Sequence, residues 1–465
     1  MIPDRLHPVL DAVRPLAERF DAAGHRIYLV GGIVRDLVLG RPLSGDIDLT
    51  TDATPEQTTA AVQGWAQAVW DQGARFGTIG VKHGDQIYEI TTHRAEAYTP
   101  DSRKPEVAFS DDVTTDLSRR DFTVNAMALR VTGTTTETPE LIDPYGGVAD
   151  LAAGLLRTPI APQESFSDDP LRMLRAARFI AGYGLRPDPA LVAAVESMVD
   201  RLEIVSAERI RDELSKLLVV DDPSDGLWFL VDTGLADVVL PELPRMRVEQ
   251  DPIHRHKDVL THTIAVVAKT RPSLIVRMAA LLHDVGKPKT RSIGAKGVSF
   301  HHHEVVGARM ARERLRALRF SNEQVEAITQ LVYLHLRFHG YGDDVWTDAA
   351  VRRYVRDAGP LLDELNELTR CDCTTRNARK AKMLADRMDA LEARIAELKE
   401  QEELDAIRPD LDGQAVMDHL GIGPGREVGE ALRMLLDARM EEGPLGREEA
   451  IRRLDAWWAS VSERS

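Results

Sequence analysis

The sequence predicts an α+β fold, with a mixed or antiparallel sheet and its helices over residues 1–155 and a chain that is helical almost to its end thereafter. Two patterns predict the sheet: the short apolar run Ile27–Val30, which a glycine turn follows, and the alternating segment Thr78–Thr92. A third pattern predicts the helices, because from about residue 150 apolar side chains recur at helical spacing and strand signals fade. At 465 residues, the chain has room for roughly three domains of about 150 residues each.

The cysteine content and the hydropathy of the chain indicate its compartment. Cys371 and Cys373 are its two cysteines, so a disulfide framework is absent and a reducing environment is expected. No stretch approaches about 18 continuous apolar residues, and the start of the chain lacks a basic region followed by an apolar run. We therefore expect a cytoplasmic protein that is not exported and has no membrane partner.

The net charge of −16, from 75 acidic and 59 basic residues, argues at face value against a nucleic-acid partner. Net charge is a sum over the whole surface, however, and a nucleic acid needs only one local basic track. The candidates for such a track are five arginines: Arg119, Arg120, Arg172, Arg175 and Arg178. The acidity therefore does not exclude an RNA partner.

Short patterns predict the remaining elements of the first 150 residues. Residues 1–26 carry apolar side chains at helical spacing, and residues 55–70 also have helical character. Prolines among charged residues in Tyr98–Ser110 predict a mobile loop over the candidate active site, which is described next. Leu141–Gly147 predicts the last strand and a turn that closes the α/β part.

Gly31 and Gly32 lie in a turn between a strand and a helix. Because they have no Cβ atoms, the backbone can approach a ligand closely there. The next residues, Ile33–Leu39, have helix-forming character and carry Arg35 in the first turn. The N-terminus of a helix behind such a turn is suited to an anion.

Asp46 and Asp48 lie two residues apart in an apolar stretch with strand character, so their side chains leave the same face of the sheet. Two such carboxylates repel unless a cation lies between them, and Mg²⁺ is the natural one because it prefers oxygen ligands shared with substrate phosphates. In a two-metal arrangement, one ion activates an attacking hydroxyl and the other neutralises a leaving pyrophosphate. Glu89 is either a third carboxylate beside the metals or a solvated strand residue.

Two later stretches carry charged side chains that suit a nucleotide. Arg120 and Asp121 are adjacent and of opposite sign, which suits a phosphate oxygen and a ribose hydroxyl respectively, although a surface ion pair is the alternative. Four further charged residues follow one another at intervals of three: Asp169, Arg172, Arg175 and Arg178. Successive members are neighbours on a helix, and a solvated arginine face would explain such a row taken alone.

Four motifs occur in order: Gly-Gly-x-x-Arg-Asp, Asp-x-Asp, Arg-Arg-Asp-Phe-Thr-x-Asn-Ala and Asp-Asp-Pro-Leu-Arg-x-Leu-Arg-x-x-Arg-Phe. The first two resemble the signature of the polymerase-beta-like nucleotidyltransferase superfamily. All four together resemble class II CCA tRNA nucleotidyltransferases and bacterial poly(A) polymerases, over roughly residues 25–180. One departure is Asp168, which stands where that family usually has Glu.

The resemblance implies a palm-type head in which Asp46 and Asp48 are catalytic and hold Mg²⁺. It also implies a set of residues that bind the triphosphate and ribose: Gly32, Arg35, Arg120, Asp121, Arg175 and Arg178. That family selects bases without a nucleic-acid template, and Asp169 and Arg172 supply an acceptor and a donor that match cytosine and adenine. Uracil and guanine would leave a buried carboxylate unpaired, at a cost of about 1–3 kcal/mol.

Histidines and aspartates between residues 251 and 375 suggest a second site. The segment Leu281-Leu-His-Asp-Val-Gly-Lys-Pro288 resembles the HD phosphohydrolase superfamily, whose side chains hold a divalent metal and hydrolyse phosphodiesters or phosphomonoesters. The resemblance implies six ligands: His262, His283, Asp284, His303, His335 and Asp372. His301 and His302 compete with His303, the metal is not identified, and a site that now only packs is the alternative.

Two patterns stand out beyond residue 380. Five apolar residues step by four and three, which core packing or a dimer contact explains equally well: Leu384, Met388, Leu391, Ile395 and Leu398. The segments Arg408–Gly413 and Leu420–Gly429 resemble the tail of the same family, where glycines would let backbone amides meet RNA phosphates or would form a tight interhelical turn.

We therefore expect an enzyme of the CCA-adding family, whose partners are tRNA, CTP and ATP. The expected parts are a head over residues 1–155, a neck and body over 156–250, an HD domain over 251–375 and a tail over 376–465. A poly(A) polymerase and a CC- or A-adding enzyme share every motif. A nucleotide-signalling enzyme would have its HD part first, and a non-catalytic RNA-binding module would need neither aspartate. The oligomeric state is not predicted.

Overall fold

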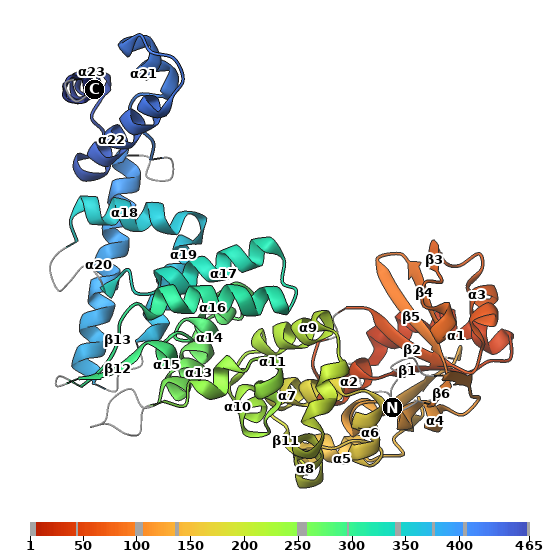
Figure 1. Ribbon diagram of the computed structural model, residues 1–465. Coiled ribbons are helices and arrows are strands. Elements are labelled where there is room, and N and C mark those ends of the chain that lie inside the picture. Colours follow the sequence, from red (N-terminus) through yellow and green to blue (C-terminus); the bar gives the residue numbers. More distant parts are fainter. Residues whose placement is uncertain are drawn as a thin grey trace. The chain divides into compact units, whose positions relative to one another are not determined.

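The computed structural model describes residues 6–42, 45–97, 106–134, 139–248, 258–294, 297–339, 346–373, 377–402 and 407–462. The chain divides into two compact units, Met1–Pro241 and Glu242–Ser465 (Figure 1). Each unit is described by itself below.

A mixed sheet forms the first part of the first unit. Within the described residues its strand order is β3-β4-β5-β2-β1-β8-β9. The strands are β1 (Ile27–Val30), β2 (Ile47–Thr51), β3 (Ala68–Trp70), β4 (Thr78–His83), β5 (Gln86–Thr92), β8 (Ala128–Val131) and β9 (Leu141–Ile142). Neighbouring strands are antiparallel except β2 and β5, which are parallel. The strand, hairpin and final strand predicted from the sequence are confirmed.

Three helices accompany the sheet: α1 (His7–Ala22), α2 (Gly32–Leu39) and α3 (Pro55–Val62). Helix α1 buries the apolar side chains of its predicted face, including Val13, Leu16 and Phe20. The phenol of Tyr88 on β5 donates a hydrogen bond to the carbonyl of Ala12, 3.0 Å away, and so ties this helix to the sheet.

Two predictions for this part are wrong. The helix predicted over residues 55–70 ends at Val62, because Gly64 adopts a left-handed φ of 73° and the chain then pairs as β3 with β4. Residues 98–105 of the predicted loop lie outside the described residues. Its next residues form strand β7 (Glu106–Phe109), which is antiparallel to β6 (Arg94–Ala97) and not a loop.

Helices build the rest of the first unit: α4 (Val113–Ser118), α5 (Gly147–Ala153), α6 (Pro162–Asp168), α7 (Leu171–Tyr183), α8 (Pro189–Met198), α9 (Ala207–Leu218), α10 (Ser224–Asp232) and α11 (Leu235–Val239). Helix α7 packs against α9 and α10 and buries apolar side chains such as Met173, Leu174 and Phe179. Two short parallel strands pair with each other: β10 (Leu155–Leu156), which precedes α6, and β11 (Arg186–Pro187), which follows α7.

The second unit is mostly helical, as predicted. Its helices are α12 (Glu242–Arg245), α13 (Val259–Lys269), α14 (Leu274–Leu282), α15 (Lys287–Thr290), α16 (His303–Ala317), α17 (Asn322–Leu334), α18 (Asp348–Ala358), α19 (Leu362–Asp372), α20 (Ala378–Glu402), α21 (Gly413–Leu420), α22 (Arg426–Glu442) and α23 (Arg447–Ser462). A hairpin of β12 (Arg291–Gly294) and β13 (Gly297–Phe300) precedes α16. None of the helices in the described parts of the chain has the length and apolarity to cross a membrane.

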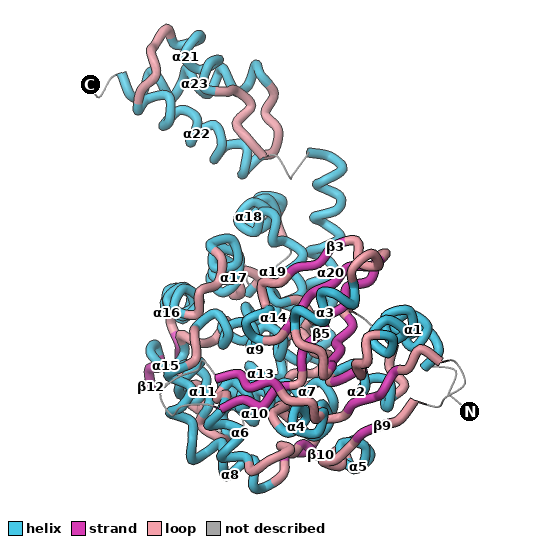
Figure 2. The backbone as a smooth tube through the Cα atoms, turned by 90° about the vertical axis from the view of Figure 1, so that its right-hand side faces the viewer, coloured by secondary structure: helices cyan, strands magenta, loops and turns pink. Residues whose placement is uncertain are grey.

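Helix α20 carries the stepped apolar residues found in the sequence. Met388, Leu391, Ile395 and Leu398 are buried within the chain, and α20 packs against α18. The pattern is therefore core packing, one of the two readings that the sequence left open. The last three helices, α21 to α23, share a separate core that includes Val416, Leu435 and Leu454 (Figure 2).

Candidate active site and candidate metal centre

Asp46 and Asp48 line a cavity of about 470 Å³ together with Gly32 and Arg35. Asp46 immediately precedes β2, and Asp48 is its second residue, so both lie at the same end of the strand. Because β2 and β5 are parallel and in register at Asp48 and Glu89, the third carboxylate lies beside the pair. Glu89 is also exposed, so its two readings, a third carboxylate beside Asp46 and Asp48 or a solvated strand residue, stay predictions.

Burial and the neighbouring acidic charges raise the proton affinity of Asp48 and of Glu89. Loss of water around the carboxylate raises the pKa of Asp48, and the charge of Asp46 adds to this, while Arg120 opposes it. Desolvation likewise raises the pKa of Glu89, followed by the charges of Asp48 and Asp46. Oxygen donors that repel one another at the edge of a cavity fit a hard divalent cation.

The glycine turn brings two guanidinium groups against the backbone. Gly31 has a φ of 72°, which is the left-handed region, and a Cβ atom there would lie 2.9 Å from Nη1 of Arg120. A Cβ atom on Gly32 would lie 3.3 Å from Nη2 of Arg35. In this structure, the groups that approach the backbone closely at the turn are therefore the guanidinium groups of two arginines.

Arg35 is only 6 % exposed, and its guanidinium is held along its edges. Its Nη1 donates to Oδ1 of Asn125 over 2.7 Å, and its Nε and Nη2 donate to the two carboxylate oxygens of Asp36, each over 3.0 Å. The guanidinium carbon lies 4.1 Å from the ring centre of Tyr183. Arg35 therefore has a defined orientation at the wall of the cavity.

Asp121 joins the head to helix α7. Its carboxylate accepts from Nδ2 of Asn125 over 2.9 Å and from Nε of Arg175 over 2.8 Å. Burial opposes ionisation, but the charge of Arg175 and these hydrogen bonds outweigh it and lower the pKa of Asp121 to about 2. Asp121 is thus a buried anion that orients an arginine, a role that the sequence did not predict.

Glu213 on α9 was missed by the sequence analysis. Its buried carboxylate lies 2.8 Å from Nε of Arg178 and 3.5 Å from Nη1 of Arg175. An acidic residue beside Ile210, Leu214 and Leu217 on the apolar face of α9 was the available signal. Such a carboxylate needs a cation, and the row of arginines on α7 supplies two.

Asp169 and Arg172 are each bonded to other groups. Asp169 pairs with Arg209 over 2.7 Å and accepts from the backbone N–H of Leu171, which caps α7. Arg172, 7 % exposed, donates to the backbone and hydroxyl of Ser165 and to the carbonyl of Arg119. Arg120 pairs with the buried Asp116 over 3.2 Å.

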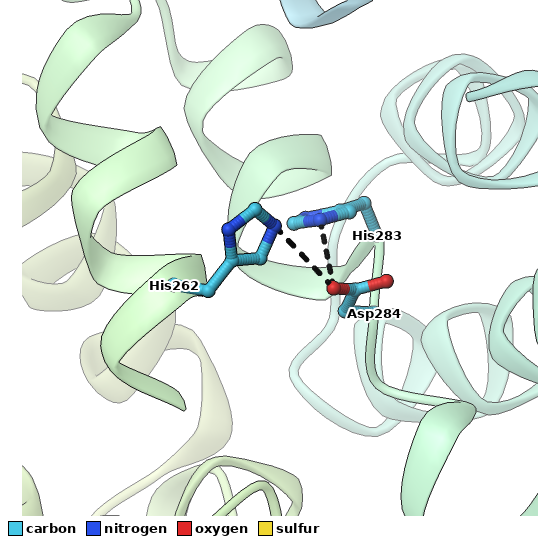
Figure 3. A group of neighbouring side chains, drawn as sticks. All are labelled: His262, His283 and Asp284. Carbon is cyan, nitrogen blue, oxygen red and sulfur yellow. Dashed lines mark ion pairs between the residues drawn. The ribbon is translucent and has the colours of Figure 1, made fainter. Parts of the chain in front are cut away.

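The six candidate ligands of the second site converge in the core of the second unit. Three come from helices α13, α16 and α19, and the others follow the ends of α14 and α17: His262, His303 and Asp372, and then His283, Asp284 and His335. Figure 3 shows His262 and His283 directed at one oxygen of Asp284. His302, by contrast, has a side chain that is 84 % exposed.

Asp284 presents its two oxygens to different histidines. Its Oδ2 lies 3.6 Å from Nε2 of His262 and 3.1 Å from Nε2 of His283. Its Oδ1 lies 3.3 Å from Nε2 of His303 and 3.9 Å from Nε2 of His335. Asp372 adds a carboxylate oxygen 2.8 Å from Nε2 of His262.

For three of these histidines, the hydrogen bond that Nδ1 makes fixes the tautomer. Nδ1 of His283, His303 and His335 lies 2.7, 2.8 and 2.7 Å from the carbonyl oxygens of Ala280, Phe300 and Val332. A carbonyl only accepts, so Nδ1 donates, and Nε2 faces the cluster. Nε2 of His303 and Nε2 of His335 then face each other over 3.2 Å, an arrangement that needs a proton or a metal ion between them. The donor set therefore fits a divalent metal.

The mixed sheet, the carboxylate cavity and the arginine-lined helix behind it define a nucleotidyltransferase-type head, here joined to a histidine–aspartate domain. Three protein families match in this order: "Poly A polymerase head domain" over residues 27–157, "Probable RNA and SrmB- binding site of polymerase A" over 184–246, and "HD domain" over 259–398. An A-adding tRNA nucleotidyltransferase from Deinococcus radiodurans is 34 % identical over 453 residues, 94 % of this chain and 96 % of that protein. The chain belongs to the tRNA nucleotidyltransferase family.

Other relatives carry a different name within this family. A CCA-adding enzyme from Lactiplantibacillus plantarum is 37 % identical over 236 residues, which are 50 % of this chain and 55 % of that enzyme. The fold is similar to that of the Bacillus stearothermophilus CCA-adding enzyme in complex with CTP, with a TM-score of 0.72, 23 % identity and full coverage of both chains. It is also similar to that of the Thermotoga maritima CCA-adding enzyme complexed with tRNA, with a TM-score of 0.60, 18 % identity and coverage of 97 % and 96 %.

These findings confirm the resemblance read from the four motifs and the α+β fold class. The head, RNA-binding and HD families lie in the predicted order. The roles of the individual site residues and the four domain boundaries stay predictions.

Proposed function

We propose that the protein adds C, C and A to the 3′ end of tRNA, using CTP and ATP and releasing pyrophosphate. The observation that carries this proposal is the cavity in which Asp46 and Asp48 meet Gly32 and Arg35. The names of the Lactiplantibacillus, Bacillus and Thermotoga relatives support the substrates. The cytoplasm, where tRNA is matured, is the proposed location, and the free thiols of Cys371 and Cys373 agree with it.

In this mechanism the head binds the reacting groups and the neck orients them. Asp46 and Asp48, with Glu89 beside them, would hold Mg²⁺, which supplies activation of the 3′-hydroxyl and neutralisation of the leaving pyrophosphate. Arg35 and Arg120 lie at the glycine turn and are suited to the triphosphate. Catalysis is then mostly positioning and charge stabilisation around an in-line attack on the α-phosphorus.

Five further groups complete the nucleotide site in this proposal. Arg175 and Arg178, held by Asp121 and Glu213, would contact the triphosphate, and Asp121 would also reach a ribose hydroxyl. Asp169 and Arg172 would read the base edge. Asp169 has to exchange its bond to Arg209 for the amine of cytosine or adenine, whereas Arg172 is already fixed by Ser165 and the carbonyl of Arg119.

A second candidate function is addition of the terminal A alone. The full-length similarity to the Deinococcus A-adding enzyme favours it. A poly(A) polymerase is the third possibility, since it shares the head and RNA-binding families.

One assay separates the three. Purified protein is incubated with tRNA lacking one, two or three terminal nucleotides, with CTP, ATP or both. A CCA-adding enzyme completes all three tRNAs when both nucleotides are present. An A-adding enzyme extends only the tRNA that ends in CC, by one A. A poly(A) polymerase adds long A tails, and the absence of any extension would refute all three assignments.

We propose in addition that the HD domain holds a divalent metal and hydrolyses a phosphodiester or phosphomonoester. The convergence of His262, His283 and Asp284 on one side, and of Asp284, His303 and His335 on the other, supports this activity. Elemental analysis of the purified protein and hydrolysis of bis-p-nitrophenyl phosphate and p-nitrophenyl phosphate test it. A protein that retains no metal and hydrolyses neither compound, with Mn²⁺, Ni²⁺, Co²⁺ or Zn²⁺ added, would show a site that only packs.

A further inference from the structure

Tyr183, at the end of α7, lies against two arginines of the head. Its ring centre is 4.1 Å from the guanidinium carbon of Arg35 and 4.5 Å from that of Arg41. Phe179, one turn earlier, stacks on the same ring, with 5.3 Å between ring centres and 23° between planes. The motifs of the family do not include Tyr183 or Arg41, and the mechanism above does not use them.

Arg35 needs support on its face because its hydrogen bonds lie along its edges. Three of its five N–H groups are used by Asp36 and Asn125, within the plane of the guanidinium. Such bonds fix the position of the group but leave it free to tilt. A ring at 4.1 Å restricts the tilt, and contact with a cation stabilises the pair by about 0.5–1 kcal/mol at an exposed site and more when water is excluded.

Arg41 reaches the same ring through the turn that ends α2. Gly40 adopts a left-handed φ of 67°, and the N–H of Arg41 then donates to the carbonyl of Asp36 over 2.9 Å. This is the usual way in which a helix closes on a glycine. The turn directs the chain so that the arginines at the two ends of α2 share one aromatic side chain of α7.

We propose that Tyr183 is a positioning residue for the triphosphate. Its ring holds the guanidinium plane of Arg35 at the wall of the cavity that contains Asp46 and Asp48, and Arg41 holds the ring. The inference rests on the proposed nucleotidyl transfer, because it assigns Arg35 to the phosphates. Since CTP and ATP share the triphosphate and differ in the base, Tyr183 acts on both nucleotides equally.

The test compares Tyr183→Leu with Tyr183→Phe. We expect Tyr183→Leu to raise KM for CTP and for ATP by about fivefold each, the loss of one cation–π contact, with kcat within about twofold of wild type. Tyr183→Phe should retain wild-type KM values, because the ring and not the hydroxyl makes the contact. Inorganic tripolyphosphate, which has no base, should inhibit Tyr183→Leu about fivefold more weakly than wild type.

A double-mutant cycle tests the link to Arg41. Arg41→Gln removes the second cation from an exposed position and should raise both KM values by about twofold. Adding it to Tyr183→Leu should change KM no further, because Arg41 acts through the ring. Tyr333→Leu removes an exposed tyrosine from the second unit and is the matched control, with wild-type values expected.

Four results would overturn the inference. They are an unchanged KM in Tyr183→Leu, a rise for only one nucleotide, an equal loss in Tyr183→Phe, and additive effects of the two substitutions. Thermal unfolding identifies a Leu variant that is merely destabilised, in which case Arg41→Gln and tripolyphosphate binding by calorimetry decide. A wild type that extends no tRNA would refute the proposed function, whereas the calorimetric comparison would still test the role of Tyr183.

Discussion

The two candidate sites of this chain are prepared for their ligands in different ways. In the head, the carboxylates of Asp46 and Asp48 repel each other at a cavity wall, and the arginines are already paired with acidic side chains. In the HD domain, buried rings are anchored through Nδ1 so that the other nitrogens face shared carboxylates. In the proposed function, a substrate and its metal would complete the first site, whereas a metal alone would complete the second.

The largest effect is expected at the head carboxylates. Asp46→Ala removes a proposed metal ligand and should reduce nucleotide addition by about a thousandfold or more, because the arginines bind phosphate but do not activate the 3′-hydroxyl. The fold should stay intact, since Asp46 is exposed. Extension of tRNA lacking its last nucleotide measures the rate of addition, and circular dichroism measures the fold. Asp71→Ala, at another exposed acid of the head, is the control, and a near wild-type rate in Asp46→Ala would contradict the metal assignment.

The next effect distinguishes two adjacent histidines in the HD domain. His303 lies in the cluster and His302 is exposed. His303→Ala should weaken metal retention by about a hundredfold or more, because a ligand is lost, whereas His302→Ala should retain it. Elemental analysis after dialysis measures the metal, and nucleotide addition should be unchanged in both variants. Equal retention in both would show that the metal is held without His303.

Acid should destabilise the head through His93. Burial lowers the pKa of His93 to about 4, so between pH 6.5 and 4 the unfolded chain binds a proton that the folded chain does not. Stability therefore falls as pH falls, by about 2 kcal/mol between pH 7 and pH 5. Hydrogen exchange of the β2 amides at the two pH values measures it.

The His93→Gln variant isolates this contribution. It removes the titrating ring beside Thr50, so its stability should change less between pH 7 and pH 5 than that of the wild type. The same slope in both proteins would assign the acid sensitivity to groups other than His93. Asp121 is not one of them, because its lowered pKa of about 2 makes its contribution to stability change only below about pH 4.

The smallest effect concerns Glu213, which holds two arginines of α7. Glu213→Gln keeps the shape but removes the charge, and KM for CTP and ATP should rise about tenfold, because Arg175 and Arg178 lose a charged partner. Steady-state kinetics measure it. Glu208→Gln, at an exposed position of the same helix, should behave as wild type. Equal KM values in the two variants would show that the arginines do not depend on the charge of Glu213.

The parts that local patterns encode were predictable. Three patterns are visible along the chain: the turn at Gly31 and Gly32, the pair Asp46 and Asp48, and the order of histidines and aspartates. In the structure, Gly32, Asp46 and Asp48 line one cavity, and the histidines cluster with Asp284 in the HD domain. The error over residues 55–70 had a local warning in Gly64 that helical periodicity outweighed. A glycine with positive φ ends a helix more effectively than neighbouring apolar residues extend it.

The parts that depend on distant contacts were not predictable. The pairs Asp121–Arg175 and Glu213–Arg178 join residues 54 and 35 positions apart. The bond between Asp169 and Arg209 likewise connects α7 to α9, where the sequence suggested that Asp169 and Arg172 work together. The packing of α7 against α9, and against the segment that carries Asp121, decides which acid meets which arginine.

The main-chain anchors of His283, His303 and His335 limit how the proposed HD chemistry can be lost. A peptide carbonyl is present whichever side chain its residue carries, so no replacement at Ala280, Phe300 or Val332 deletes the acceptor itself. In related proteins that have lost this activity, we therefore expect the histidines to be substituted first, while the helices and turns that orient them are retained.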